Sequence, residues 1–421
     1  MKEHDQKEGM LAPYRVLDLS DEKGFLCGKI LGDLGASVIK IERPGGDESR
    51  NIGPFYKDIP DPEKSLYWFA YNNNKKGITL NIDTASGQAI FKQLAARADF
   101  IIESFEPGYL EKLGLDYTGL KVFNPGMIMT SITSFGQSGP YKDFKASDIE
   151  LMAMSGFMSL LGHPGGPPVR VSCPQSYVWT GMHAAMGTMI AHYCKITTGE
   201  GQHVDVSAQD SILWAMAHAP TFWDVSRINV AREGAFVTGR SVTGAKMRCL
   251  YPCRDGYINF IVYGGVAGQK TNQALTEWMD SKGMATEYLR QKDWSKFNIA
   301  SVTQEEIDLI EGPTVEFFKT LTKAEFLQEA IKRRMLGYPV SSAEDIFEDP
   351  QLKHRNFWEQ VEHPELDTSI VYPGGFGKFS IAPCGIKMRA PLIGEHNQEI
   401  YEEELGLTRA ELIRLKEANV I

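Results

Sequence analysis

The feature that most constrains the fold is a strand–helix–strand pattern within residues 14–42. The β-branched, apolar run YRVLDLS, residues 14–20, predicts a strand. GFLCGKILGDLG, residues 24–35, has apolar residues at helical spacing and ends on a glycine, a common helix stop. ASVIKIE, residues 36–42, predicts a second strand. Two strands connected through a helix run parallel, so we expect an α/β fold with a parallel sheet.

The same alternation continues through the first half of the chain. Further strands are expected at GITLNI, DFIIESF and MIMTSITSFG, residues 77–82, 99–105 and 127–136. A helix is expected at 85–96, and two long apolar helices at 147–161 and 181–193. This succession predicts an open Rossmann-like domain.

The pattern of apolar and charged residues changes after residue 224. KMRCLYPCRDGYINFIVYGG, residues 246–265, predicts short strands joined by a turn, and charged helical patterns follow to residue 331. We therefore expect a Rossmann-like large domain beginning with residues 1–224 and a smaller α/β domain at 225–335. Residues 336–421 are expected to return to the large domain.

Charge and hydropathy limit the partners. The formal net charge of −10 argues against a nucleic-acid partner, although a local anion site can still be positive. No run of about 18 apolar residues is present, so no membrane association is expected. The first ten residues, MKEHDQKEGM, are charged and lack the apolar core of a secretory signal, which predicts a cytoplasmic protein.

Two cofactor classes are disfavoured by missing motifs. The loop after the first strand reads DEKG in place of GxGxxG, which disfavours a nicotinamide or flavin enzyme. The six cysteines are scattered, and Cys249 and Cys253 have no second cysteine or histidine pair near them in sequence. We expect reduced thiols and no metal site.

Positive side chains stand at the ends of expected strands in the first domain. Arg43, Lys75 and Lys112 are at or near positions where ligands collect in open α/β sheets. Such cations suit a multiply phosphorylated ligand, and the alternative is that they are ordinary solvated charges. Phe105 could stack on a base or fill the core.

Several motifs, read in order, resemble the family III CoA-transferases, the formyl-CoA transferase and carnitine CoA-transferase group. They are LGDLGASVIKIERPGGDESR, YNNNKKGITLNI, ADFIIESFEPGYLEKLGLDY, NPGMIMTSITSFGQSGPY, TGEGQHVDVSAQD and RAPLIGEHNQEIYEEELGL. The resemblance implies an interlocked-ring dimer that takes coenzyme A or an acyl-CoA as substrate in the large domain. Arg43, Lys75, Phe105 and Lys112 match positions that contact CoA in the family, where cations suit its phosphates.

The resemblance also implies that the family's nucleophile is missing from this chain. In the family, an aspartate attacks the donor acyl-CoA thioester and then carries the CoA as an aspartyl thioester. That position is Tyr177 here, and the flanking PQS and VWT contain no acid. A phenol with a pKa of about 10 is almost wholly protonated at pH 7. We therefore expect no catalytic residue; Asp148 or Glu150 could replace the carboxylate, or could stabilise a helix N-terminus.

Other departures from the family pattern accompany this loss. Gly24 is followed by Phe25 in place of proline, the glycine-rich flap is broken to GGVAGQ, and Thr133 stands where a lysine or related polar residue is expected. The racemase branch needs a His–Asp pair, which would fall on Ser147 and Tyr177. Neither residue can move the α-proton in that way, which disfavours racemisation.

Some family members are heteromers in which only one of two related chains carries the aspartate. This chain resembles such an aspartate-lacking subunit, so we expect a heterodimer or heterotetramer with a homologous aspartate-containing chain. The analogy points to transfer from succinyl-CoA to an aryl-substituted succinate such as (R)-benzylsuccinate. Four aromatic residues could line an aryl pocket or fill the core: Trp179, Trp214, Phe222 and Trp223. The alternative is a self-sufficient CoA-transferase, or a CoA-dependent isomerase or racemase, with another nucleophile.

Overall fold

The structure is a computed structural model and describes residues 8–421. Residues 1–7 of the charged amino-terminal stretch lie outside the described residues. The chain forms two compact units, which are described separately. Unit 1 comprises Met1–Met158, Arg170–Arg227 and Gln351–Ile421, and unit 2 comprises Ser159–Val169 and Ile228–Pro350. The sequence places the small domain at 225–335; this division extends it to Pro350 and adds Ser159–Val169.

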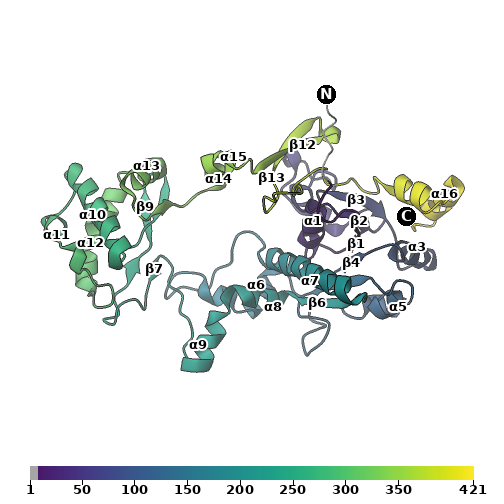
Figure 1. Ribbon diagram of the computed structural model, residues 1–421, viewed down its shortest axis with the longest axis horizontal. Helices are drawn as coiled ribbons and strands as arrows, with labels where there is room; N and C mark the ends of the chain where they lie inside the picture. Colours follow the sequence, from purple (N-terminus) through teal and green to yellow (C-terminus); the bar gives the residue numbers. More distant parts are fainter. Residues whose placement is uncertain (1–7) are drawn as a thin grey trace. The chain divides into compact units, whose positions relative to one another are not determined.

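Unit 1 is built on a six-stranded parallel sheet (Figure 1). The spatial order is β3-β2-β1-β4-β5-β6. The strands are β1 (Arg15–Leu19), β2 (Ser37–Glu42), β3 (Lys75–Thr79), β4 (Phe100–Glu103), β5 (Ile128–Thr133) and β6 (His203–Ser207). Val16 pairs with Val38 on one side and with Phe100 on the other. The predicted α/β class with a Rossmann-like parallel sheet is confirmed.

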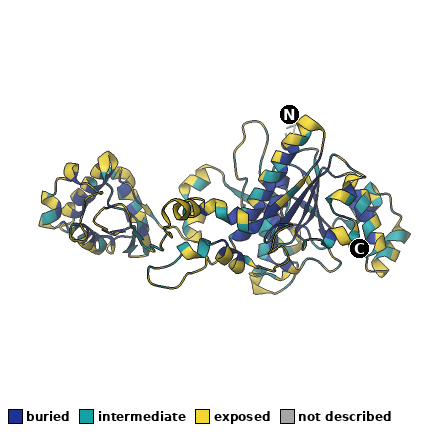
Figure 2. Cartoon of the chain, turned by 90° about the horizontal axis from the view of Figure 1, so that it is seen from below, coloured by how far each residue is buried: buried dark blue, intermediate teal, exposed yellow. Residues whose placement is uncertain are grey.

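Successive residues of each strand enter two different cores, because side chains alternate between the faces of a sheet. Leu17 and Ile39 pack on α3 (Ala85–Ala95) and on residues near the carboxyl terminus. Val16 and Val38 pack on α1 (Phe25–Asp33) and α7 (Ser176–Thr198). Figure 2 shows the sheet as the dark, buried centre between helices with exposed outer faces.

Helices α1 and α7 approach closely because α7 is rich in small residues. A Cβ at Gly181 would stand 2.8 Å from the Cβ of Leu26, so this position excludes any side chain. Ala184 and Ala185 are buried one turn further along the same helix. This close packing fixes the amino-terminal end of α7, where Tyr177 lies.

Three element boundaries differ from expectation. The long helix expected at 147–161 ends early, since α6 spans Asp148–Met154 and Gly156 takes a left-handed φ of 84°. The helix expected at 181–193 is the middle of α7. Strand β3 begins at Lys75, because Lys75 already pairs with Val38 of β2.

The remaining elements of unit 1 are a hairpin and several short helices. The hairpin β12 (Trp358–His363) and β13 (Thr368–Pro373) packs with Phe25 and Trp68. The short helices are α2 (Leu66–Tyr71), α4 (Tyr109–Leu113), α5 (Tyr117–Lys121), α8 (Ala208–Leu213), α9 (His218–Ser226), α15 (Pro350–His354) and α16 (Arg409–Glu417). Within residues 8–421, no helix has both the length and the apolar character that a membrane span requires.

Unit 2 has its own core of aromatic side chains, including Tyr251, Trp278 and Phe318. Its strands are β7 (Phe236–Val237), β8 (Met247–Arg248), β9 (Leu250–Cys253), β10 (Gly256–Asn259) and β11 (Tyr338–Pro339), paired antiparallel. Its helices are α10 (Gly265–Ser281), α11 (Glu287–Gln291), α12 (Gln304–Phe318), α13 (Lys323–Arg333) and α14 (Ala343–Glu348). The GGVAGQ stretch forms the start of α10, with Gly264 as its N-cap.

Candidate functional site

Two cavities lie at the carboxyl ends of the parallel strands in unit 1, and Phe105 lines both of them. The first, about 370 Å³, is called the acid-lined cavity because five carboxylate residues surround it with one arginine. These are Asp21, Glu22, Glu42, Asp47, Glu48 and Arg43. The carboxyl edge is the usual ligand side of an open α/β sheet, so the location fits a binding site.

The second cavity, about 320 Å³, has the opposite character. It is lined by four lysines, Lys23, Lys112, Lys142 and Lys145, and is called the lysine cavity. Thr133 also lines it; its hydroxyl accepts a hydrogen bond from the amide of Gly136 at 2.9 Å. Three of the four side chains expected to contact CoA, Arg43, Phe105 and Lys112, therefore gather around the two cavities.

Lys75 lies elsewhere, in the interior of the protein. Its ammonium donates to Oδ2 of Asp18 at 2.8 Å, to the carbonyl oxygen of Phe25 at 2.9 Å and to Oδ1 of Asn72 at 3.0 Å. Burial lowers the pKa of Lys75, whereas Lys75 and Lys40 hold the pKa of Asp18 below its usual value against the effect of burial. The three donors of Lys75 are thus used within the protein, and Lys75 lines neither cavity.

Arg43 and Phe105 are connected through Tyr109, a residue that sequence reasoning missed. The Arg43 side chain is 65% exposed and forms an ion pair with Asp83 at 3.2 Å. Tyr109 accepts a hydrogen bond from Arg43 at 3.4 Å and donates one to Asp83 at 2.6 Å. Its ring packs on that of Phe105 with centroids 4.7 Å apart. The aromatic residue in GYLEKLG was the available signal.

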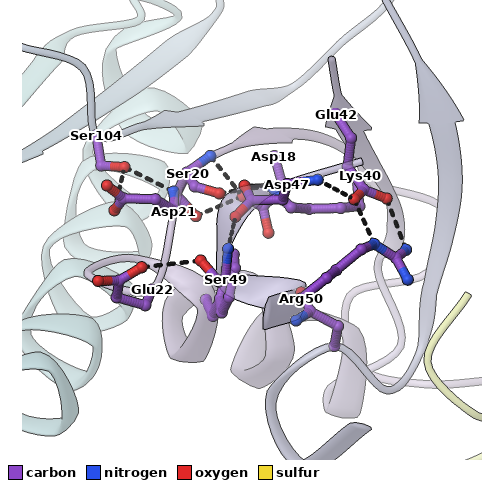
Figure 3. A network of polar contacts seen from close by, with 12 residues as sticks. Asp18, Ser20, Asp21, Glu22, Lys40, Glu42, Asp47, Ser49, Arg50 and Ser104 are labelled. Atoms are coloured by element: carbon purple, nitrogen blue, oxygen red, sulfur yellow. Dashed lines mark hydrogen bonds and ion pairs between the residues drawn. The ribbon is translucent and has the colours of Figure 1, made fainter. Parts of the chain in front are cut away.

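The wall of the acid-lined cavity is held by a polar network (Figure 3). Arg50 donates to both carboxylate oxygens of Glu42, at 2.6 and 2.8 Å. Glu42 also accepts the amide of Asp47 at 2.8 Å, which fixes the loop that follows β2. Ser49 of that loop donates to Glu22 at 2.8 Å, so the network reaches the loop that follows β1.

Tyr177 is the second residue of α7 and only 8% exposed. It belongs to a small hydrophobic cluster with Leu151, Met152, Ala208 and Ile212. Burial raises the pKa of its phenol, and the negative charges of Glu22, Asp21 and Asp148 raise it further. The phenol therefore stays neutral at physiological pH.

The two carboxylates considered as replacements both serve helix N-termini. Oδ1 of Asp148 accepts hydrogen bonds from the amides of Gln175 at 2.8 Å and Ser176 at 2.9 Å, and from the Ser176 hydroxyl at 2.8 Å. Glu150 forms a capping box with Ser147 at the start of α6. The carboxylate that sequence reasoning missed is Glu22, which lines the acid-lined cavity and acts on Tyr177 through its charge.

The remaining candidates lie away from these cavities. Trp179 packs on Phe157 with ring centroids 4.8 Å apart, and Trp214, Phe222 and Trp223 are exposed. None of the four lines either cavity. Among residues 8–421, no group of three or more His, Cys, Asp or Glu side chains is arranged to hold a metal ion.

The motifs and this geometry agree with comparisons to known proteins. The family model for "CoA-transferase family III" matches residues 11–397. The chain belongs to this family. It is 34% identical to the succinyl-CoA:(R)-benzylsuccinate CoA-transferase subunit BbsE of Thauera aromatica, over 93% of each chain. It is 32% identical to the formyl-CoA:oxalate CoA-transferase of Streptomyces avermitilis, over 97% of this chain and 98% of the other.

A solved structure supports the same assignment. The CAIB/BAIF family protein from Brucella suis superimposes with a TM-score of 0.79 at 28% sequence identity. The alignment covers 94% of this chain and 100% of the other. The family resemblance expected from the motifs is confirmed, and with it a transferase family whose substrates are CoA thioesters.

Proposed function

We propose that this chain is the non-catalytic subunit of a heteromeric family III CoA-transferase. It would pair with a homologous chain that carries the nucleophilic aspartate. The observation that carries the proposal is Tyr177, a buried and neutral phenol at the position where the family resemblance places the nucleophilic aspartate. The overall reaction would move CoA between two carboxylic acids.

The chemistry explains why a phenol cannot replace the carboxylate. The nucleophile must be ionised when it attacks the thioester, and it must leave again from a mixed anhydride. The environment of Tyr177 opposes ionisation because of its burial and its three acidic neighbours. Asp148, beside it, is already engaged in capping α7 through Oδ1.

One face of α7 supports the proposal that this chain associates with a second chain. Met182, Met186, Ile190 and Tyr193 are exposed and recur at intervals of three or four residues, so they lie on one side of the helix. A contiguous exposed apolar stripe commonly marks a protein interface. The name of the Thauera aromatica relative describes a subunit, which supports association with a related chain. An interlocked-ring dimer is the arrangement that the family resemblance implies.

The proposed substrates follow from similarity. The 34% identity to the BbsE subunit supports succinyl-CoA as donor and (R)-benzylsuccinate, or a similar aryl-substituted succinate, as acceptor. A CoA thioester as substrate also supports contacts between the bound CoA and Arg43, Phe105 and Lys112. Lys75, from its three internal hydrogen bonds, would instead join β3 to β1 and α1 beneath the site.

One observation favours the competing function, a self-sufficient transferase. Glu22 lines the acid-lined cavity close enough to Tyr177 to shift its pKa, so a carboxylate is present near the lost nucleophile. A mixed anhydride on Glu22 would need that side chain to give up its hydrogen bond from Ser49.

Intact mass spectrometry separates the two functions. The purified chain alone is incubated with succinyl-CoA, and its mass is measured before and after hydroxylamine, which cleaves acyl adducts. We expect no adduct on the lone chain and CoA transfer only after the aspartate-containing homologue is added. An adduct that maps to Glu22 would reject the non-catalytic role and support the self-sufficient enzyme.

A further inference from the structure

We propose that residues 389–401, called the latch segment, bind the edge of the sheet while His396 is neutral and are released when His396 takes up a proton. The latch segment is part of the RAPLIGEHNQEIYEEELGL motif, to which the proposed function assigns no role. The inference does not rest on that function, because it concerns how the fold is held together beside the acid-lined cavity.

The latch segment covers an edge strand, and it does so largely with side chains. Strand β3 is at the edge of the six-stranded sheet, which leaves one row of its N–H and C=O groups to be satisfied outside the sheet. The amide of Thr79 donates to Oδ1 of Asn397 at 2.9 Å, and its carbonyl oxygen accepts the hydroxyl of Tyr401 at 2.6 Å. A Cβ at Gly77 would stand 2.8 Å from the Cβ of Pro391, so only glycine lets the segment approach this closely.

His396 makes the contact that depends on protonation. Its backbone amide donates to the carbonyl oxygen of Gly77 at 2.9 Å, and its ring Nδ1 accepts the Gly77 amide at 3.1 Å. An imidazole nitrogen accepts a hydrogen bond only while it carries no proton, so the bound ring is neutral with its proton on Nε2. A protonated Nδ1 would direct its own N–H at the N–H of Gly77, and this contact would be lost.

The charged groups around His396 leave its ring neutral. They are Glu395, Glu399 and Arg389 of the latch segment and Lys76 of β3. Burial is the largest effect and lowers the pKa of His396; the two carboxylates raise it, and the two cations lower it. Each carboxylate is already paired, Glu395 with Arg389 at 2.6 Å and Glu399 with Lys76. The net result is a lowered pKa for His396 in the bound latch segment.

The direction of the pH dependence follows from this lowered pKa. A histidine in a released, solvated segment has a pKa of about 6.5. Between that value and the lower one of the bound form, the released form holds a proton that the bound form lacks, so the bound form loses stability as the pH falls below about 6.5. From about pH 7.5 to about pH 5.5, the equilibrium should shift toward release by up to about tenfold.

The latch segment also supports the wall of the acid-lined cavity. The carbonyl oxygen of Pro391 accepts hydrogen bonds from the guanidinium of Arg50 at 2.9 Å and from the indole N–H of Trp68 at 3.1 Å. Arg50 in turn holds Glu42 of the cavity wall (Figure 3). Backbone hydrogen bonds close the turn between Pro391 and His396, so release at His396 should reach Arg50 and the wall.

Hydrogen–deuterium exchange of the full chain, read by mass spectrometry of its peptides, tests the latch segment at about pH 7.5 and about pH 5.5. After correction for the intrinsic pH dependence of exchange, the protection of β3 should fall by up to about tenfold at the lower pH. The protection of residues 43–52, beside the cavity wall, should fall with it. Strand β1, at the centre of the sheet, is the internal reference for global opening.

Variants of His396 separate titration from packing. His396→Asn places Oδ1 where the ring has Nδ1, and this oxygen accepts an N–H at either pH, so the protection of β3 should no longer depend on pH. His396→Ala removes the acceptor and should give low protection of β3 at both pH values. His354→Asn, at an exposed histidine on α15, is the matched control and should respond like the wild type.

Three results would contradict the proposal. Unchanged protection of β3 in the wild type between the two pH values would overturn the latch, and so would a His396→Asn variant that loses protection as the wild type does. An equal loss in β1 would mean global opening and would overturn it as well. Loss in β3 without loss in residues 43–52 would overturn the connection to the cavity wall.

Discussion

Tyr177, at the position where the family resemblance places the nucleophilic aspartate, is part of a small hydrophobic core. Tyr177→Asp would remove a ring packed on Leu151 and Ile212 and would bury a carboxyl beside Glu22 and Asp148. We expect the free energy of unfolding to fall by about 3 kcal/mol or more. We also expect no CoA-transferase activity in the lone chain, because burial and neighbouring charges oppose ionisation of the new carboxyl. Urea denaturation and an acyl-CoA exchange assay measure the two effects.

Tyr177→Phe is the control for this substitution. It keeps the ring and removes only the hydroxyl, so stability should change by less than about 1.5 kcal/mol. An active, stable Tyr177→Asp variant would show that the site lacks only its nucleophile and would weaken the idea of a specialised subunit.

Glu103, at the end of β4, should make the stability of the protein depend on pH. Burial raises the pKa of its carboxyl to about 7, although hydrogen bonds from Ser131 and the Phe105 amide favour the charged form. A glutamate in the unfolded chain has a pKa of about 4.3. Between these values the folded protein holds a proton that the unfolded chain has released, so the free energy of unfolding falls as pH rises from about 4.3 to about 7.

The side-chain amide of the Glu103→Gln variant cannot ionise. The free energy of unfolding of this variant should therefore not fall as the pH rises from about 4.3 to about 7. We expect it to be more stable than the wild type by about 1–3 kcal/mol at pH 8, and the difference to close below about pH 5. Denaturation curves across this range measure the gap. Glu111→Gln, at an exposed position on α4, is the matched control, because it makes the same substitution outside the core. A constant gap for Glu103→Gln would mean that its effect is packing and not titration.

At the scale of elements, Arg50 joins segments that are far apart in the sequence. Its guanidinium is buried and bonds to Glu42 at the end of β2, to Glu63 at 2.8 Å and to the carbonyl oxygen of Pro391 at 2.9 Å. It also stacks over Trp68 at 3.8 Å. Arg50→Ala would leave Glu42 buried without its partner, so we expect a loss of about 3–5 kcal/mol in urea denaturation.

Arg43→Ala is a matched comparison for Arg50→Ala. The Arg43 side chain is mostly exposed and forms a single ion pair, so its removal should cost less than about 1 kcal/mol of stability. Equal losses for the two variants would show that the Arg50 network does not hold the cavity wall. Arg50→Lys keeps the charge but cannot form the fork to Glu42, and it should lie between the two.

The sequence predicts those elements whose information is local. The apolar spacing of residues 14–42 predicted β1, α1 and β2 within one or two residues, since each pattern faces one side of the sheet. The helix expected at 147–161 failed because Gly156 turns the chain, and a glycine at that point could equally have been helical. The Arg50 network could not be predicted, because Glu63 and Pro391 approach it only in the folded chain.

The candidate site shows the same limit. Arg43, Phe105 and Lys112 were placed near a ligand by their positions after strands and by family motifs. Lys75 has the same sequence context, yet it begins β3 and its side chain enters the interior beside Asp18. Lys142 stands in a long connection whose path depends on tertiary packing, so its position in the sequence could not predict that it lines the same cavity as Lys112.

At the scale of the whole molecule, the exposed stripe on α7 makes the proposed function depend on association with a partner chain. Met186→Glu with Ile190→Glu would put two charges in the centre of this stripe, where a partner would have to desolvate them. We expect the variant to stay folded, because both side chains are exposed in the single chain. Association with the co-expressed aspartate-containing homologue should weaken at least about tenfold, and transferase activity should fall with it. Light scattering after size-exclusion chromatography and exchange assays measure both.

Val122→Glu provides the control, because Val122 is an exposed apolar residue at the end of α5 and outside the stripe. If both variants associate like the wild type, the stripe is not the interface. If the α7 variant loses association but the lone homologue keeps full activity, the partner does not need this chain for catalysis. Loss of both together is the result that a non-catalytic subunit predicts, since its contribution to the reaction then acts through the shared fold and not through Tyr177.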